Sequence, residues 1–103
     1  MWIVPDKVRN FAITYNYITM KAAISWEAPL QPNGFILAYN LSIGVIGQAK
    51  TPFVFNETTF SFSFQVPTRC RQYAAVISAY TTVGPGPPNE KNFTATAPGI
   101  VAF

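Results

Sequence analysis

Apolar and polar residues alternate over several short stretches of this chain, and no helical period is sustained for long. The clearest stretches are residues 20–26, 35–43 and 59–66, in which apolar side chains occupy every second position. Successive side chains of a β-strand point to opposite faces, so each stretch predicts a strand with one buried face. Further strands are expected at residues 73–79 and 93–96, where the same period returns.

Proline, glycine and asparagine separate these segments. Gln31-Pro32-Asn33-Gly34 predicts a turn, because proline fixes φ and the Asn-Gly pair tolerates positive φ. Val83-Gly84-Pro85-Gly86-Pro87-Pro88 predicts a stiff connecting loop, since these residues are poor at continuing a β-ladder. Short strands without helices between them indicate an all-β fold, in which two antiparallel sheets pack face to face.

The large side chains of the alternating segments are the candidate core. The strand at 35–43 places Phe35 and Leu37 on the same face as Tyr39. Three phenylalanines within 59–66 would invite aggregation if they were exposed along a strand, so they are expected to face the interior. The positions expected in the core are Trp26, Tyr39, Phe60, Phe62, Phe64, Tyr73 and Ile77.

Size and composition point to a single domain. The chain has 103 residues, of which 50% are hydrophobic and 11% charged. No apolar stretch reaches the roughly 18 residues that a membrane-spanning helix needs, so direct membrane insertion is not expected. Seven Lys/Arg residues against four Asp/Glu give a net charge of +3. The basic residues are scattered rather than gathered on one face, so nucleic acid is not an expected partner.

Catalytic groups are scarce. The chain has no histidine, which is the commonest general base and the commonest nitrogen ligand of metals. Its four carboxylates lie on separate segments, without the paired spacing that glycosidases use. One thiol without a histidine cannot build a usual zinc site, and neither a phosphate-binding glycine loop nor a nucleophile elbow occurs. We therefore expect no catalytic residues, no metal, no cofactor and no enzymatic activity.

The single cysteine, Cys70, cannot form a disulfide within the chain. Three interpretations stay open: a partly buried free thiol, a bridge to a neighbouring domain, or a reactive thiol. Arg69 and Arg71 would lower the pKa of a thiol between them, but the chain offers no histidine to act as its base.

Three motifs together resemble the fibronectin type III family, and the resemblance runs from about residue 5 to 98. In order, they are Ser25-Trp26-Glu27-Ala28-Pro29, then Asn33-Gly34-Phe35-Ile36 continuing to Tyr39 and Leu41, then Tyr73, Ala75, Ile77 and Ala79 followed by Gly84-Pro85-Gly86. The resemblance implies an immunoglobulin-like antiparallel β-sandwich of seven strands, with Trp26 in the core. It also implies that Tyr73 forms a tyrosine corner, its hydroxyl bonding to nearby backbone.

The domain organisation expected from this resemblance has three parts. Residues 5–98 form the fibronectin type III-like domain, and residues 1–4 are a starting segment or linker. Residues 99–103 are expected to be a linker toward a following domain.

Asn-x-Ser/Thr motifs occur three times, at Asn40, Asn56 and Asn92, where composition predicts roughly one by chance. They are candidates for N-glycosylation and indicate the secretory pathway; ordinary polar surface positions are the alternative. Asn40 alternates against Tyr39 and Leu41, and Asn92 precedes Phe93, so both are expected to point outward. The sheet order implied by the resemblance places Asn40 and Asn92 on the same outer face.

The resemblance implies a non-catalytic extracellular module of a multidomain receptor or adhesion protein, for example a receptor tyrosine phosphatase ectodomain. The expected partners are neighbouring domains of the same chain and a further extracellular protein. The alternative is an accessory module beside a secreted catalytic domain, such as a carbohydrate-active enzyme.

Overall fold

The structure is a computed structural model that describes residues 4–67 and 71–95, and within them the chain forms β-strands and no helix. All pairings between neighbouring strands are antiparallel. The strands are β1 (Arg9–Asn16), β2 (Lys21–Glu27), β3 (Ala38–Val45), β4 (Thr51–Asn56), β5 (Ser61–Gln65), β6 (Arg71–Thr81), β7 (Gly84–Pro85) and β8 (Asn89–Ala95).

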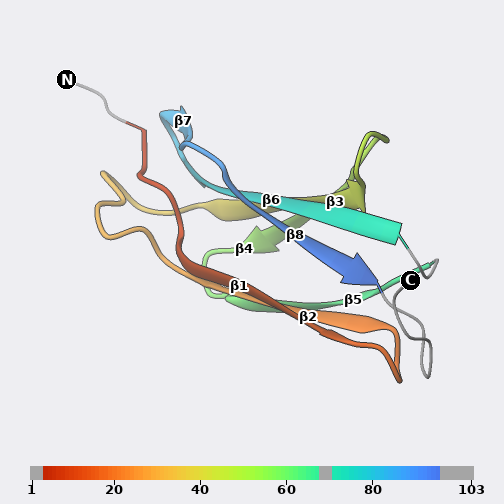
Figure 1. The fold of residues 1–103 in the computed structure, drawn as a ribbon. Coiled ribbons are helices and arrows are strands. Elements are labelled where there is room, and N and C mark those ends of the chain that lie inside the picture. Colours follow the sequence, from red (N-terminus) through yellow and green to blue (C-terminus); the bar gives the residue numbers. More distant parts are fainter. Residues whose placement is uncertain (1–3, 68–70, 96–103) are drawn as a thin grey trace.

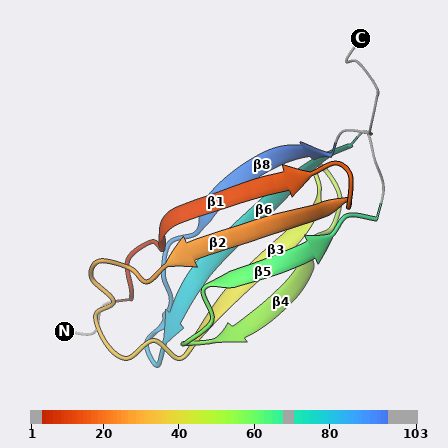
Figure 2. The same ribbon diagram turned by 90° about the horizontal axis from the view of Figure 1, so that it is seen from below.

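Two sheets face each other across one core (Figure 1). The three-stranded sheet has the order β1-β2-β5, and the five-stranded sheet has the order β4-β3-β6-β7, with β8 also paired to β6. Seen from below, the strands of the two sheets run in roughly aligned directions (Figure 2). The expected all-β sandwich of two antiparallel sheets is therefore confirmed.

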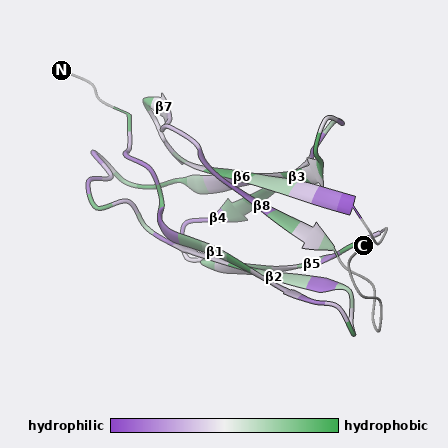
Figure 3. Ribbon diagram, in the orientation of Figure 1, coloured by the Kyte–Doolittle hydropathy of each residue, from purple (hydrophilic) through white to green (hydrophobic). Residues whose placement is uncertain are grey.

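Alternation along the strands builds the core, as period-2 patterning requires. In β2 every second residue is buried, and in β3 Tyr39, Leu41 and Ile43 are at most 1% exposed while their neighbours are half-buried. The hydrophilic colour in Figure 3 concentrates at strand ends and connections, for example at the start of β6. Fully burying each large apolar side chain stabilises the fold by about 1.5–3 kcal/mol.

Four phenylalanines fill the side of the sandwich where β4 lies opposite β5. The ring centroids of Phe53 and Phe62 are 4.8 Å apart, those of Phe55 and Phe62 are 5.1 Å apart, and Phe64 lies 6.1 Å from Phe53. All four are only partly buried and pack against the main core cluster. This side of the molecule is thus closed by aromatic side chains rather than by backbone pairing.

The expected burial of Phe35 and Leu37 is wrong. The strand begins only at Ala38, and Phe35 is 90% exposed while Leu37 is 51% exposed. Ile36 packs against the core in their place. The cause is the turn before them, in which Asn33 and Gly34 both have positive φ, so that the period-2 pattern begins later than the sequence suggests.

Candidate recognition surfaces

The ionisable side chains do not converge on a common site. Among the described residues, no group of three His, Cys, Asp or Glu side chains lies close enough to hold a metal ion. The four carboxylates are all exposed and come from different elements: Asp6, Glu27, Glu57 and Glu90. Cys70 lies outside the described residues.

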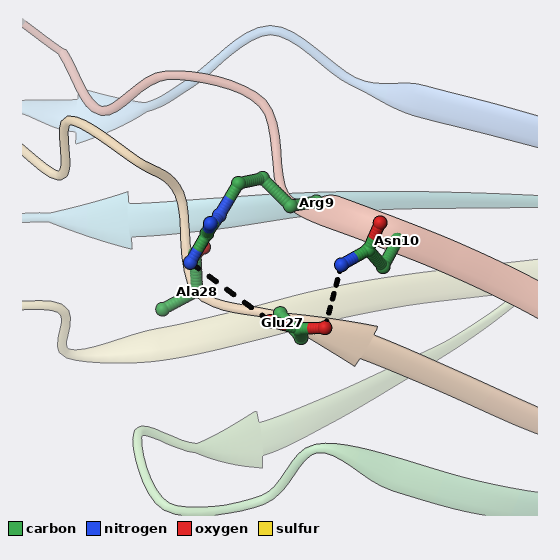
Figure 4. A network of polar contacts seen from close by, with 4 residues as sticks. All are labelled: Arg9, Asn10, Glu27 and Ala28. Atoms are coloured by element: carbon green, nitrogen blue, oxygen red, sulfur yellow. Dashed lines mark hydrogen bonds and ion pairs between the residues drawn. The ribbon is translucent and has the colours of Figure 1, made fainter.

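A network of polar side chains lies on the surface at the bulge in β1 (Figure 4). Asn10 donates from Nδ2 to Glu27 Oε2 at 2.6 Å, and Arg9 donates from Nε to the Ala28 carbonyl at 2.9 Å. Arg9 and Glu27 also form an ion pair at 3.9 Å, with side chains 46% and 56% exposed. Such exposed pairs contribute at most about 1 kcal/mol. We interpret the network as a set of contacts that stabilises the bulge. At the bulge, Asn10 has a positive φ and the register with β2 shifts.

The three sequon asparagines have different surroundings. Asn56 is exposed, and its Oδ1 accepts hydrogen bonds from the Thr58 amide at 3.1 Å, the Thr58 hydroxyl at 2.9 Å and the Thr59 hydroxyl at 2.8 Å. This arrangement is an Asx turn, in which the side-chain oxygen of Asn56 is engaged by the residues that follow it. Asn92 is exposed on β8. Glycosylation at each position stays a prediction.

Asn40 is only half-buried and lies in a hollow of about 350 Å³ on the outer face of the five-stranded sheet. Its Nδ2 donates to the Tyr80 hydroxyl at 3.4 Å, and its Oδ1 is buried without a hydrogen-bond partner. A sugar on Nδ2 would compete with the bond to Tyr80. The hollow is lined by Leu37, Ala38, Asn40, Val54, Tyr80 and Thr81.

Asn40 and Asn92 share one outer face of the five-stranded sheet. Asn40 lies opposite Ser78 and Asn92 lies opposite Ala74, and both partners belong to β6. Ser78 and Ala74 are four residues apart on that strand, so their side chains point the same way. The two asparagines therefore lie on the same surface, as the sheet order implied by the family resemblance led us to expect.

A second surface lies in the connection between β2 and β3. Leu30 is 71% exposed and Phe35 is 90% exposed, and both belong to this connection. In Figure 1 the connection between β2 and β3 reaches the same end of the molecule as β7. Exposed apolar patches are typical of protein contact sites, so these two side chains make the connection a candidate surface. No sequence signal marked Phe35 as part of such a surface, because alternation assigned it to a strand.

The predicted core residues lie as follows. Trp26, Tyr39, Tyr73 and Ile77 are at most 2% exposed, whereas Phe62 and Phe64 are partly buried. Phe60 is 43% exposed, so its expected burial is wrong: it precedes β5, at the rim of the sandwich. Tyr73 stacks on Phe93, with ring centroids 5.3 Å apart and planes inclined by 13°. The tyrosine-corner hydrogen bond stays a prediction.

Solved structures share this architecture. The sixth fibronectin type III domain from human fibronectin type III domain containing protein 3 has a TM-score of 0.80 at 17% identity, covering 98% of this chain and 94% of that one. The chain has the fibronectin type III fold. The extracellular region of rat CD45, domains d3–d4, has a TM-score of 0.76 at 19% identity, covering 88% of this chain and 49% of that one. The family resemblance noted in the sequence is thereby confirmed at the level of the fold.

Among curated proteins, the chain is 29% identical over 91 residues to human protein sidekick-1. The match covers 84% of the chain, and the chain spans 4% of the length of sidekick-1. No protein-family model matches the chain. Within the described residues, no helix is long and apolar enough to cross a membrane.

Proposed function

We propose that this chain is a non-catalytic extracellular module of a multidomain cell-surface protein, acting as a spacer and a protein-recognition unit. The observation that carries the proposal is the similarity to a 4% portion of sidekick-1 together with the fibronectin type III fold, since a module of this size recurs within far longer chains. The similar domains of rat CD45 belong to the extracellular region of that protein, which supports the same compartment here. A receptor tyrosine phosphatase ectodomain is one architecture that would carry such a module.

The shape suits a spacer. The molecule is elongated, with extents of 53 × 24 × 18 Å, and its strands run along the long direction (Figures 1 and 2). The first described residues lie at the end that carries β7, and β8 finishes at the opposite end (Figure 1). A module spanning residues 5–98 would thus separate its neighbours by roughly its own length.

Recognition is proposed for the connection between β2 and β3, with Phe35 and Leu30 as apolar anchors. Aromatic and aliphatic side chains that become fully desolvated supply most of the binding energy of protein interfaces. The outer face with Asn40 and Asn92 is the less suitable surface, because sugars on both asparagines would obstruct flat docking.

The experiment is expression of the domain with its native neighbours in a secreting eukaryotic cell, followed by intact mass before and after enzymatic removal of N-glycans. We expect sugar mass that maps to Asn40, Asn56 or Asn92. The matched variants are Ser42→Ala, Thr58→Ala and Thr94→Ala, which remove each sequon but keep the asparagine. A protein unmodified at all three sites would contradict the extracellular assignment and favour an accessory module beside a secreted catalytic domain.

A further inference from the structure

The two sheets end in edge strands that differ in how they discourage further pairing. Edge strands expose unpaired backbone groups, and proteins commonly guard them with proline, charge or a bulge. β4 contains Pro52, β8 carries Glu90 and Lys91, and β1 has a register shift between Arg9 and Ala12. β5 has none of these features, since its sequence is uncharged, regular and free of proline.

The pattern of hydrogen bonds between β5 and β2 shows which backbone N–H and C=O groups of β5 face its free edge. Trp26 N–H donates to the Phe60 carbonyl at 3.0 Å, and Val66 N–H donates to the Met20 carbonyl at 2.8 Å. Hydrogen-bonded pairs alternate along an antiparallel ladder, so even-numbered residues from 60 to 66 direct their backbone groups toward β2.

The intervening residues Ser61, Ser63 and Gln65 therefore direct their N–H and C=O groups away from β2. All three are exposed. Within the part of the chain that the structure describes, β5 pairs with β2 and with no other strand. The edge thus presents a row of backbone donors and acceptors at which a further strand can add.

The sequence at this edge is self-complementary. Phe60-Ser61-Phe62-Ser63-Phe64 reads the same in both directions. If two copies meet antiparallel with Phe62 opposite Phe62, then each Ser61 faces a Ser63, and each Phe60 faces a Phe64. The serine pairs take the hydrogen-bonded positions, and the phenylalanine pairs take the positions where side chains of opposing strands lie closer.

Charge does not oppose this contact. Residues 58–67 contain no charged side chain, so no like charges meet along the new ladder. On β2, Lys21 lies opposite Gln65. In the antiparallel arrangement Gln65 faces Thr59 of the second copy, which brings Glu57 of that copy toward the same end. Each end of the ladder thus offers opposite charges.

We propose that β5 is a self-pairing edge, at which two copies of this chain join antiparallel and extend the β1-β2-β5 sheet across the contact. The partner is a second copy of the same chain, because the edge sequence is palindromic. Association stops at two copies, because pairing occupies the free edge of β5. Among the described strands, no other edge lacks a proline, charged residues and a bulge. The inference is independent of the proposed function.

The test is sedimentation velocity over a concentration series up to roughly 0.5 mM, where weak dimers become visible. A reducing agent excludes disulfides through Cys70. The double variant S61K/S63K places lysine opposite lysine twice, and it should weaken dimerisation at least about tenfold, because directly opposed like charges are destabilising. The matched control, A23K/S25K, puts the same charges on the neighbouring strand of the same face, since Ala23 pairs with Ser63 and Ser25 with Ser61. It should dimerise like the parent.

A charge-swap arm distinguishes lost pairing from lost folding. S61E/S63E alone should be as monomeric as S61K/S63K, and an equimolar mixture of the two should form a heterodimer. Thermal unfolding confirms that each variant is folded. A parent protein that is monomeric throughout the series, a dimer indifferent to S61K/S63K, a mixture that stays monomeric, or open-ended association beyond two copies would each overturn the proposal.

Discussion

Tyr39 is a buried tyrosine whose hydroxyl group ionises less readily than that of the free residue. It is 1% exposed, and its ring contacts Trp26 and Phe60 at centroid distances of 5.9 Å each. Burial removes water that would solvate a phenolate, so the pKa of the Tyr39 hydroxyl is raised above its ordinary value of 10.0. The fold therefore favours the neutral phenol.

This shift predicts a loss of stability in alkali. A group whose pKa is higher in the folded state contributes stability that is complete below its unfolded pKa and declines as pH rises through the folded value. We expect the free energy of unfolding of the parent to fall above pH 10, and the decline to be smaller in Tyr39→Phe. Urea unfolding at a series of pH values measures it. The matched control is Tyr17→Phe, because Tyr17 is 47% exposed, and this variant should follow the parent.

Among the described residues, two buried side-chain atoms have no hydrogen-bond partner, Trp26 Nε1 and Asn40 Oδ1. An unsatisfied buried donor or acceptor costs about 1–3 kcal/mol. Trp26 also supplies large apolar area to the core, which offsets that cost. Asn40 lies at the sheet surface, so its unpaired oxygen marks the hollow beside Tyr80 as a position where a donor group would be favourable.

At the scale of elements, strict alternation predicted the strands that lie on both sides of the core. The segments at 20–26 and 59–66 correspond to β2 and β5, and the segment at 73–79 lies within β6. Three strands were not recognised from the pattern, and one of them is the two-residue β7, which lies within the segment predicted to be a connecting loop. β1 carries a bulge that breaks its alternation, and β4 contains Pro52, which reads as an interruption. An edge strand with a bulge or a proline therefore cannot be recognised from strict alternation. Bulges and prolines are common in edge strands.

The candidate surfaces were only partly predictable. The sequons are local motifs, so Asn40, Asn56 and Asn92 could be found. Parity along the strands predicted that Asn40 and Asn92 point outward, and the sheet order implied by the family resemblance placed them on one face. The hollow at Asn40 depends on Tyr80 and Val54, which reach it from β6 and β4 through the strand register. Register is a property of the assembled sheet, and a single sequence does not state it. The same applies to the exposure of Phe35, which the turn before β3 determines.

The connection from β7 to β8 fits tightly against the N-terminal segment, at Gly86. The Gly86 amide donates to the Ala79 carbonyl at 2.8 Å, and a Cβ at Gly86 would lie 2.2 Å from the Pro5 carbonyl oxygen. Backbone atoms cannot yield as a flexible side chain does. The glycine is therefore required for close approach of two segments that lie far apart in sequence.

Gly86→Ala is expected to destabilise the domain by about 1–3 kcal/mol, the usual range for overpacking in a filled interior. Urea unfolding provides the measurement. The companion variant lacks residues 1–5, which removes the two nearest atoms, both of Pro5, and leaves the Asp6 carbonyl oxygen at 3.2 Å. In that shortened background, Gly86→Ala should lower the free energy of unfolding distinctly less, since coupling between contacting groups disappears when one of them is removed. Equal costs in both backgrounds would show that Gly86 matters for its own backbone and not for its contact with Pro5.

At the scale of the whole molecule, non-local pairing holds the chain together. β3 pairs with β6 through residues such as Tyr39 and Ala79, and β2 pairs with β5 over a similarly long separation in sequence. Such contacts form only after large loops close, and the entropy of closure must be recovered from buried apolar area. Small extracellular domains often lower this cost with disulfides. With one cysteine in the whole chain, this domain has no such cross-link within itself.

The hydrophobic core must therefore supply the stability alone, and a reducing agent should leave the midpoint of thermal unfolding unchanged. Loss of a native disulfide typically costs about 2–5 kcal/mol, which would lower the midpoint of a domain of this size by several degrees. Calorimetry of the parent with and without reductant measures the difference, and Cys70→Ser is the control. A drop in the parent that is absent in Cys70→Ser would mean that Cys70 links two copies covalently. In that case the thiol, rather than the edge of β5 alone, would join them, and the interpretation of Cys70 as a free thiol would be wrong.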